Sequence, residues 1–288
     1  MAMSPVVSRQ MYRTLEPYHA QVYFVPEAKR AYEKIGLQGS RMGYFASRGA
    51  PLGPVSAHVL AAIFYNFHPA LVQRAIPDAW QRATQEQIIA ARFEAADAAL
   101  RRLLWDHLES QELAEGAQLA REATTACPIE GRPLFAATAK LPWPEQPHLA
   151  LWHATTLLRE FRFGGHCAAL MAEGINACEA LVTHAATGEI SAKALQSSRA
   201  WSDEEWAATV QRLQERGWLN ADGTLTEEGK AHRDAVEQRT DQLALPPWEH
   251  LGEANCKRLR ELVRPFSIAI TNAGTFPASL SPWEDKEA

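Results

Sequence analysis

The sequence predicts a mainly α-helical chain in which two tandem copies of one unit fold together as an intramolecular pseudo-dimer. An internal repeat, capped helical segments and a lone hairpin signal in the second half lead to this prediction. The 288 residues also fit about two domains. We expect a first unit over 1–110, a helical and proline-rich crossover over 111–147, a second unit over 148–250, and a C-terminal helix with a loose tail over 251–288.

The repeat consists of matching motifs in the same order. V-Q-R-x5-W occurs at 72–80 and again at 210–218, an offset of 210 − 72 = 138 residues, and this offset also maps Gly36 onto Gly174. Two further pairs follow the same order: Y-H-A at 18–20 with W-H-A at 152–154, and W-D-H-L at 105–108 with W-E-H-L at 248–251. Ordered matches with slowly drifting offsets indicate a duplication.

The second unit has the clearer local signals. Ser202 followed by Glu205 predicts a capping box at the start of a helix, and Trp206, Val210 and Leu213 place one face of that helix in the core. The pair D-G at 222–223, between apolar residues, predicts a tight hairpin, and a long helix is expected over 227–243. Helices followed by a short hairpin and another helix are the order of a winged helix, so we expect a winged-helix-like unit with a small β-wing.

The first unit keeps the helices but loses the wing. Only three residues separate Trp80 from Thr84, too few for a hairpin like that of the second unit. Pro69 follows His68 where a proline suits the first position of a helix. We therefore expect the V-Q-R helix of the first unit to run to Trp80 with a reduced wing behind it.

Two resemblances follow from longer stretches of the chain. The segment LQERGWLNADGTLTEEGKAHRDAV resembles the wing region of MarR-type regulators. Across nearly its full length the chain resembles an uncharacterised actinobacterial helix-turn-helix family, the SalK-like proteins, through stretches such as LEPYHAQVYFVPEA, FYNFHPALVQRAIPDAW and LPWPEQPHLALWHATTLLREFR. The resemblance implies the winged-helix fold and little about activity.

The charge pattern disfavours DNA binding. The formal net charge is −5 and the pI is about 6.1. The candidate recognition helix opens with Asp203, Glu204 and Glu205, and the hairpin carries Asp222 but no lysine or arginine. Binding to DNA depends largely on basic side chains that neutralise phosphates. The MarR resemblance keeps a ligand-responsive transcriptional regulator as the alternative, although a shared fold is weak evidence of function.

Other classes of protein receive no support. The four cysteines form no C-x-x-C pair, and the histidine spacing does not indicate a metal or haem site, so the cofactor stays unknown. The N-terminus lacks the apolar core of a signal peptide, and no apolar run is long enough for a membrane span. We expect a cytoplasmic protein, present as a monomeric pseudo-dimer or as a homodimer.

Candidate ligand-binding residues come from the repeated motifs and from one charged helix. Tyr18-His19 and Trp152-His153 would meet near the interface of the two units, either as core residues or as a polar pair facing a shared pocket. A helix bearing Arg159, Arg162 and His166 would suit a carboxylate or phosphate, unless Gly164-Gly165 breaks it. The candidates are Tyr18, His19, Tyr65, His68, Trp152, His153, Arg159, Arg162 and His166.

These observations favour a ligand-binding protein over a DNA-binding one. We expect a small-molecule-binding protein, with an enzyme of specialised metabolism as one form of it, that holds its ligand between two winged-helix-like halves. Whether it catalyses a reaction is left open, because no Ser-His-Asp order, glycine-rich phosphate loop, H-E-x-x-H motif or paired metal spacing is present. A structural module without a ligand is the third reading.

Overall fold

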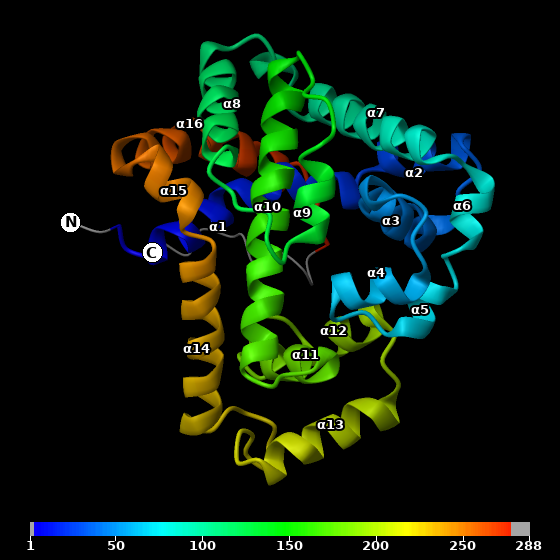
Figure 1. Cartoon of the computed structure of the whole chain (residues 1–288), viewed down its shortest axis with the longest axis vertical. Helices are drawn as coiled ribbons and strands as arrows, with labels where there is room; N and C mark the ends of the chain where they lie inside the picture. Colours follow the sequence, from blue (N-terminus) through cyan, green and yellow to red (C-terminus); the bar gives the residue numbers. More distant parts are fainter. Residues whose placement is uncertain (1–2, 278–288) are drawn as a thin grey trace.

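The computed structural model describes residues 3–277, and helices make up most of this range (Figure 1). The first part contains α1 (Val6–Ala20), the 3₁₀ turn η1 (Gln21–Tyr23), α2 (Pro26–Lys34), α3 (Gly39–Gly49), η2 (Ala50–Leu52), α4 (Ala57–Phe64), α5 (Pro69–Gln73), α6 (Asp78–Arg82), α7 (Gln85–Leu103) and η3 (Trp105–His107). The remainder contains α8 (Gln111–Thr124), α9 (Pro133–Thr138), α10 (Pro147–Ala172), α11 (Ala177–Ala185), α12 (Ala192–Arg199), α13 (Asp203–Glu215), α14 (Glu227–Leu243), α15 (Pro246–Leu251) and α16 (Glu253–Asn272).

Helix α10 is the axis of the fold. It spans 26 residues, begins with Pro147 in its first turn and is buried over most of its length. The helix continues without a break through Gly164 and Gly165, where a Cβ atom would come within 2.8 Å of the Arg132 side chain and 3.0 Å of Leu243 Cβ. The two glycines therefore admit close neighbours instead of ending the helix.

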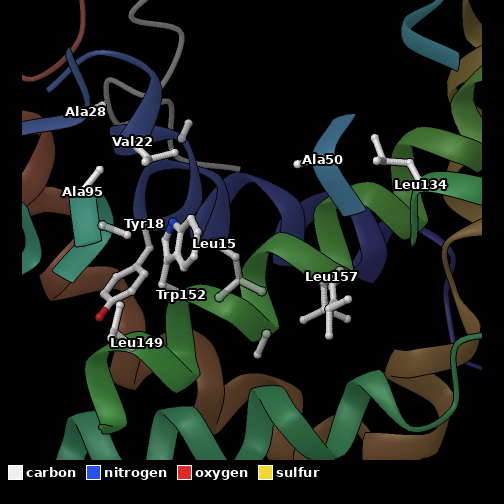
Figure 2. Packing of buried hydrophobic residues seen from close by; sticks show 14 of the residues in the cluster. Leu15, Tyr18, Val22, Ala28, Ala50, Ala95, Leu134, Leu149, Trp152 and Leu157 are labelled. Carbon is white, nitrogen blue, oxygen red and sulfur yellow. The ribbon is translucent and has the colours of Figure 1, made fainter. Parts of the chain in front are cut away.

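Two hydrophobic clusters lie along this axis. The larger one joins α1, α2, α3, α7, α8, α15 and α16 to the first half of α10. Figure 2 shows the indole of Trp152 beside Tyr18 and Leu15, which come from α1. The smaller cluster contains Ala169 and Leu170 at the end of α10 together with residues of α11, α13 and α14. Because α10 belongs to both clusters, it links them as one stiff element.

The segment from α13 to α14 follows its local signals closely. Ser202 and Glu205 form the predicted capping box at the start of α13, and α14 has the predicted bounds, residues 227–243. The predicted wing is reduced to a single antiparallel bridge between Leu219 and Leu225, and no longer strand forms within residues 3–277. The elements of the smaller hydrophobic cluster are therefore held together by helix packing rather than by a sheet.

The V-Q-R segment of the first half differs from the expected single helix. Helix α5 ends at Gln73, and the chain turns before α6 begins at Asp78, so Trp80 lies on a separate helix. Pro77 precedes α6 and has no N–H with which to continue the helical hydrogen bonds of α5. The prediction of one helix ending at Trp80 was wrong for this reason.

Two remaining expectations concern the ends of the chain and the membrane. The C-terminal helix predicted within residues 251–288 is α16, whereas the tail predicted after it lies almost wholly outside the described residues. Among residues 3–277, no helix combines the length and the apolar character that a membrane crossing requires.

Candidate ligand-binding site

The two aromatic-His-Ala motifs meet where α1 crosses α10. The Trp152 indole Nε1 donates a hydrogen bond to the His19 carbonyl oxygen at 3.2 Å, and the Tyr18 hydroxyl donates to the His148 carbonyl oxygen at 3.1 Å. All three aromatic and histidine side chains of this crossing, Tyr18, His19 and Trp152, are buried. These two bonds join α1 to α10.

A directed chain of hydrogen bonds runs through His19. Arg92 Nη2 donates to the Tyr23 hydroxyl at 3.1 Å, and that hydroxyl lies 3.0 Å from His19 Nε2. His19 Nδ1 lies 2.9 Å from Thr156 Oγ1, which donates to the Trp152 carbonyl oxygen at 2.8 Å. The Tyr23 proton must therefore point to Nε2, and His19 carries its proton on Nδ1. Both ring nitrogens are occupied, and burial and nearby arginines hold the pKa of His19 well below its usual value.

A buried ion-pair cluster lies next to this chain. Arg48 donates from Nε and Nη2 to the two oxygens of Glu160 at 2.8 and 2.9 Å, and Arg159 Nη1 lies 3.1 Å from both oxygens. Burial alone would raise the pKa of Glu160, but the two guanidinium groups outweigh it and hold the pKa well below the usual range. One negative carboxylate thus pairs with two positive guanidinium groups.

A second buried carboxylate, Glu16, is far less well compensated. Its Oε1 lies 3.8 Å from Arg159 Nε, and its Oε2 has no hydrogen-bond partner. Burial raises the pKa of Glu16 to about 7, and the attraction of Arg159 offsets only part of that shift. Glu16, Arg159 and Arg162 also line a small cavity of about 20 Å³.

Another cavity of the same size, about 20 Å³, lies against Trp152 and His153. Its polar wall contains Ser47, Arg48, Arg92, Thr156 and Glu160, and its apolar wall contains Pro51, Ile89, Phe93 and Leu141. A space of this size holds about one water molecule.

His153 is the member of this wall with an unused polar atom. Its side chain is 1% exposed, yet its Nε2 has no hydrogen-bond partner. The ring packs edge-on against Trp143 at 4.8 Å between centroids, and burial lowers its pKa to about 4. His153 is therefore a neutral imidazole that lines the cavity and has a buried, unpartnered Nε2.

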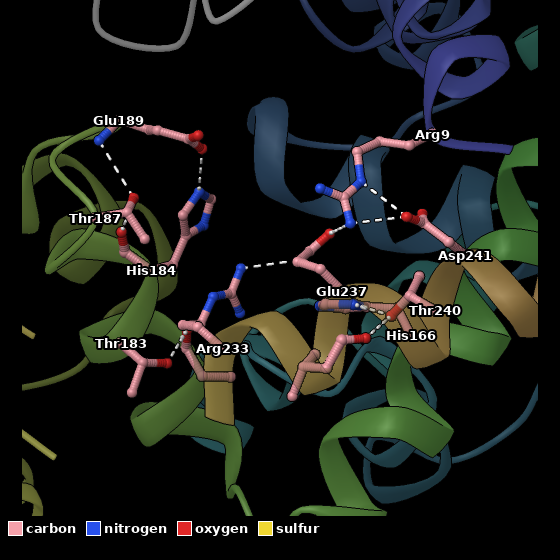
Figure 3. A network of polar contacts seen from close by, with 12 residues as sticks. Arg9, His166, Thr183, His184, Thr187, Glu189, Arg233, Glu237, Thr240 and Asp241 are labelled. Atoms are coloured by element: carbon pink, nitrogen blue, oxygen red, sulfur yellow. Dashed lines mark hydrogen bonds and ion pairs between the residues drawn. The ribbon is translucent and has the colours of Figure 1, made fainter. Parts of the chain in front are cut away.

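The other charged candidates on α10 face α14. Arg162 Nη1 lies 2.8 Å from Asp241 Oδ1, and His166 Nδ1 lies 3.0 Å from the Thr240 hydroxyl oxygen. Figure 3 shows His166 beside Thr240, with Asp241 reaching Arg9 of α1. Arg159 and Arg162 share the Glu16 cavity, whereas His166 belongs to this α10–α14 contact.

Tyr65 and His68 lie apart from both cavities, where the chain between α4 and α5 touches the segment before α11 and the start of α13. The Tyr65 hydroxyl donates to the Ile175 carbonyl oxygen. His68 caps α5, and its Nε2 lies 3.0 Å from Glu205 Oε1 in the first turn of α13. His68 therefore joins the two V-Q-R segments, and Tyr65 joins the end of α4 to the segment before α11; neither lines the two cavities.

Arg48, Arg92, Glu160 and Tyr23 were absent from the sequence-based candidates. Arg48 and Glu160 are 112 residues apart, so no local spacing links them. One signal was present: Glu160 lies four residues after Thr156 and eight after Trp152 on a helix with few solvent-facing positions. A carboxylate on that face needs a buried cation, and this could have been inferred.

Comparison with known proteins gives one match. A family model described as a helix-turn-helix family matches residues 8–277. Neither the curated proteins nor the solved structures contain a match to the chain. Within residues 3–277 no group of three or more His, Cys, Asp and Glu side chains is arranged to hold a metal ion.

Proposed function

We propose that this chain, which belongs to the helix-turn-helix family, is a small-molecule-binding protein whose ligand occupies the cavity beside His153. The buried, unpartnered Nε2 of His153, a residue that lines the cavity, carries the proposal. An unsatisfied buried polar atom costs about 1–3 kcal/mol of stability, and such atoms are rare in folded proteins. A ligand atom that bonds to Nε2 would recover this cost.

The neighbours of His153 strengthen this interpretation. His19, Thr156 and Glu160 around it all have hydrogen-bond partners, so the free nitrogen is not part of a generally loose region. Pro51, Ile89 and Leu141 on the apolar wall are only half-buried, which places the cavity within one side-chain layer of the surface. Movement of these side chains would enlarge the space and admit a ligand bigger than one water molecule.

A cavity-filling variant tests the proposal. Thr138 lines the cavity and its hydroxyl donates only to the Leu134 carbonyl oxygen within α9, so Thr138→Met adds bulk without breaking a long-range contact. Thr271→Met is the matched control, because Thr271 makes the same type of bond to Ser267 on α16 and does not line this cavity.

The readout is the retention of small molecules from a metabolite extract, measured by native mass spectrometry and by thermal shift. The wild type and Thr271→Met are expected to retain the same compound, and Thr138→Met to lose it. Equal retention by Thr138→Met, or no retained compound in the wild type, would overturn the proposal.

A ligand-responsive transcriptional regulator, MarR-like in form, is the second candidate, and membership of the helix-turn-helix family favours it. Its surface chemistry is unfavourable. Asp203 and Glu204 are exposed at the start of α13, and Arg212 and Arg216 both lie near Glu179, at 3.8 and 3.6 Å. Fluorescence anisotropy with a randomised duplex pool at physiological salt distinguishes the two functions. Sequence-specific binding with a Kd below about 10⁻⁸ M would favour the regulator.

A further inference from the structure

We infer that the ligand of this cavity is an organic acid whose carboxylate binds between Arg92 and His153. The inference rests on the proposed function and adds the chemical class of the ligand. Arg92 is 6% exposed, and within residues 3–277 no carboxylate lies within ion-pair distance of it. Its hydrogen bonds go to neutral hydroxyl groups, Tyr23 Oη at 3.1 Å and Ser47 Oγ at 3.4 Å.

A buried guanidinium without a counter-ion is unusual, because burying an unpaired charge is costly. Glu160, the nearby carboxylate, is already shared by Arg48 and Arg159. The region therefore contains three guanidinium groups, while Glu160 is fully ionised and Glu16 only partly so at neutral pH.

The surroundings of Tyr44 indicate the same excess of positive charge. Its hydroxyl accepts a hydrogen bond from Arg48 Nη1 at 3.0 Å. Burial raises the pKa of a phenol, yet the pKa of Tyr44 is lowered because the charges of Arg48, Arg159 and Arg199 outweigh burial. An anion bound in this region would meet a favourable potential.

The groups that line the cavity favour a carboxylate among anions. A planar carboxylate matches the fork of an arginine, and a second oxygen can accept a hydrogen bond from the imidazole Nε2 when the proton is there. Arg92 and His153 line the same cavity, and the charge of Arg92 contributes to the lowered pKa of His153. The remaining walls at Ile89, Phe93 and Leu141 are apolar and suit a carbon body, which inorganic phosphate lacks.

Isothermal titration calorimetry with acid and amide pairs tests the inference. The probes are propanoate against propanamide, benzoate against benzamide, and inorganic phosphate. We expect the wild type to bind at least one acid at least tenfold more tightly than its amide, and more tightly than phosphate. Arg92→Gln is expected to weaken acid binding at least tenfold, and Arg92→Lys, which keeps the charge but loses the fork, to weaken it less.

The matched control is Arg216→Gln. The Arg92 Cζ lies 5.5 Å from the ring centroid of Trp152, and the Arg216 Cζ likewise lies 3.8 Å from the ring centroid of Trp218, which belongs to the smaller hydrophobic cluster. This variant should bind acids like the wild type. Circular dichroism and the Tm of each variant without ligand verify the fold. A well-folded Arg92→Gln that binds acids with unchanged affinity would overturn the inference.

The inference and the proposed function can fail separately. Tight binding of an amide that Thr138→Met abolishes would overturn the carboxylate and leave the cavity as a ligand site. If no acid binds but an extract compound of another class is retained, the carboxylate is likewise overturned and the cavity remains a ligand site. If no acid binds and no extract compound is retained, both fail.

Discussion

Replacing Glu160 by glutamine should be among the most destabilising single changes in this chain. The carboxylate accepts contacts from two guanidinium groups, and the side chains of Glu160 and Arg48 are each 2% exposed. Removing one partner of a buried ion pair costs about 3–5 kcal/mol, because the remaining charge is left uncompensated. Glu160→Gln leaves two such charges, Arg48 and Arg159, so we expect a loss in the upper part of that range.

The assay is urea denaturation followed by circular dichroism, with stability taken from the shift in midpoint at constant m-value. Glu115→Gln is the matched control, since Glu115 pairs with Arg258 at 2.6 Å but their side chains are 42% and 47% exposed. Exposed pairs contribute about 0–1 kcal/mol. If the two variants differ by less than about 1 kcal/mol, the argument that this cluster anchors α3 to α10 is refuted.

Three further predictions concern pH and glycine. The free energy of unfolding of Glu16→Gln, relative to the wild type, should rise by about 3 kcal/mol between pH 4.5 and pH 8. The reason is that the wild type loses stability as the pH rises from 4.5 to 7, because the pKa of Glu16 is about 7 in the folded protein. Urea midpoints at several pH values measure this difference, and a difference that does not change with pH would contradict it. Gly229→Ala should lose about 3–5 kcal/mol by urea denaturation, because its Cβ would lie 2.1 Å from the Trp218 carbonyl oxygen, and a smaller loss than 1 kcal/mol would count against this contact. Gly116→Ala in α8 should gain up to about 1 kcal/mol in the same assay, because its Cβ would meet Val263 at an acceptable 3.4 Å; destabilisation would show that α8 and α16 are packed more tightly.

Features of the fold that depend on neighbouring residues could be predicted from the sequence. The capping box at Ser202 and the start of α14 after Thr226 involve bonds over three residues, so the pattern contains all the information that forms them. For the first V-Q-R segment, the prediction of a single helix was wrong. Its match to the V-Q-R motif at residues 210–218 predicts one helix, but Pro77 restricts the backbone and lacks the N–H that such a helix needs.

The candidate site could be predicted only in part. His153 was identified because its motif repeats, and Arg159 because of its helix. The role of Arg92 depends on which hydroxyl groups and carboxylates surround it, and these come from η1, α3 and α10. His19 and His153 have the same motif yet differ in one respect that the sequence does not contain: Tyr23 and Thr156 occupy both nitrogens of His19, while Nε2 of His153 is buried without a partner.

The contact between the V-Q-R segments weighs on how far the helix-turn-helix fold implies DNA binding. In dimers that read DNA, the N-terminal residues of both recognition helices contact bases about 34 Å apart. Here His68 at the start of α5 lies 3.0 Å from Glu205 at the start of α13, and Trp201 Nε1 donates to the Asn66 carbonyl oxygen at 3.0 Å. Groove reading by this pair would require both contacts to separate and the acidic turn of α13 to face phosphates. Ligand binding beside His153 requires only that half-buried side chains move, so it is the smaller departure from the observed structure.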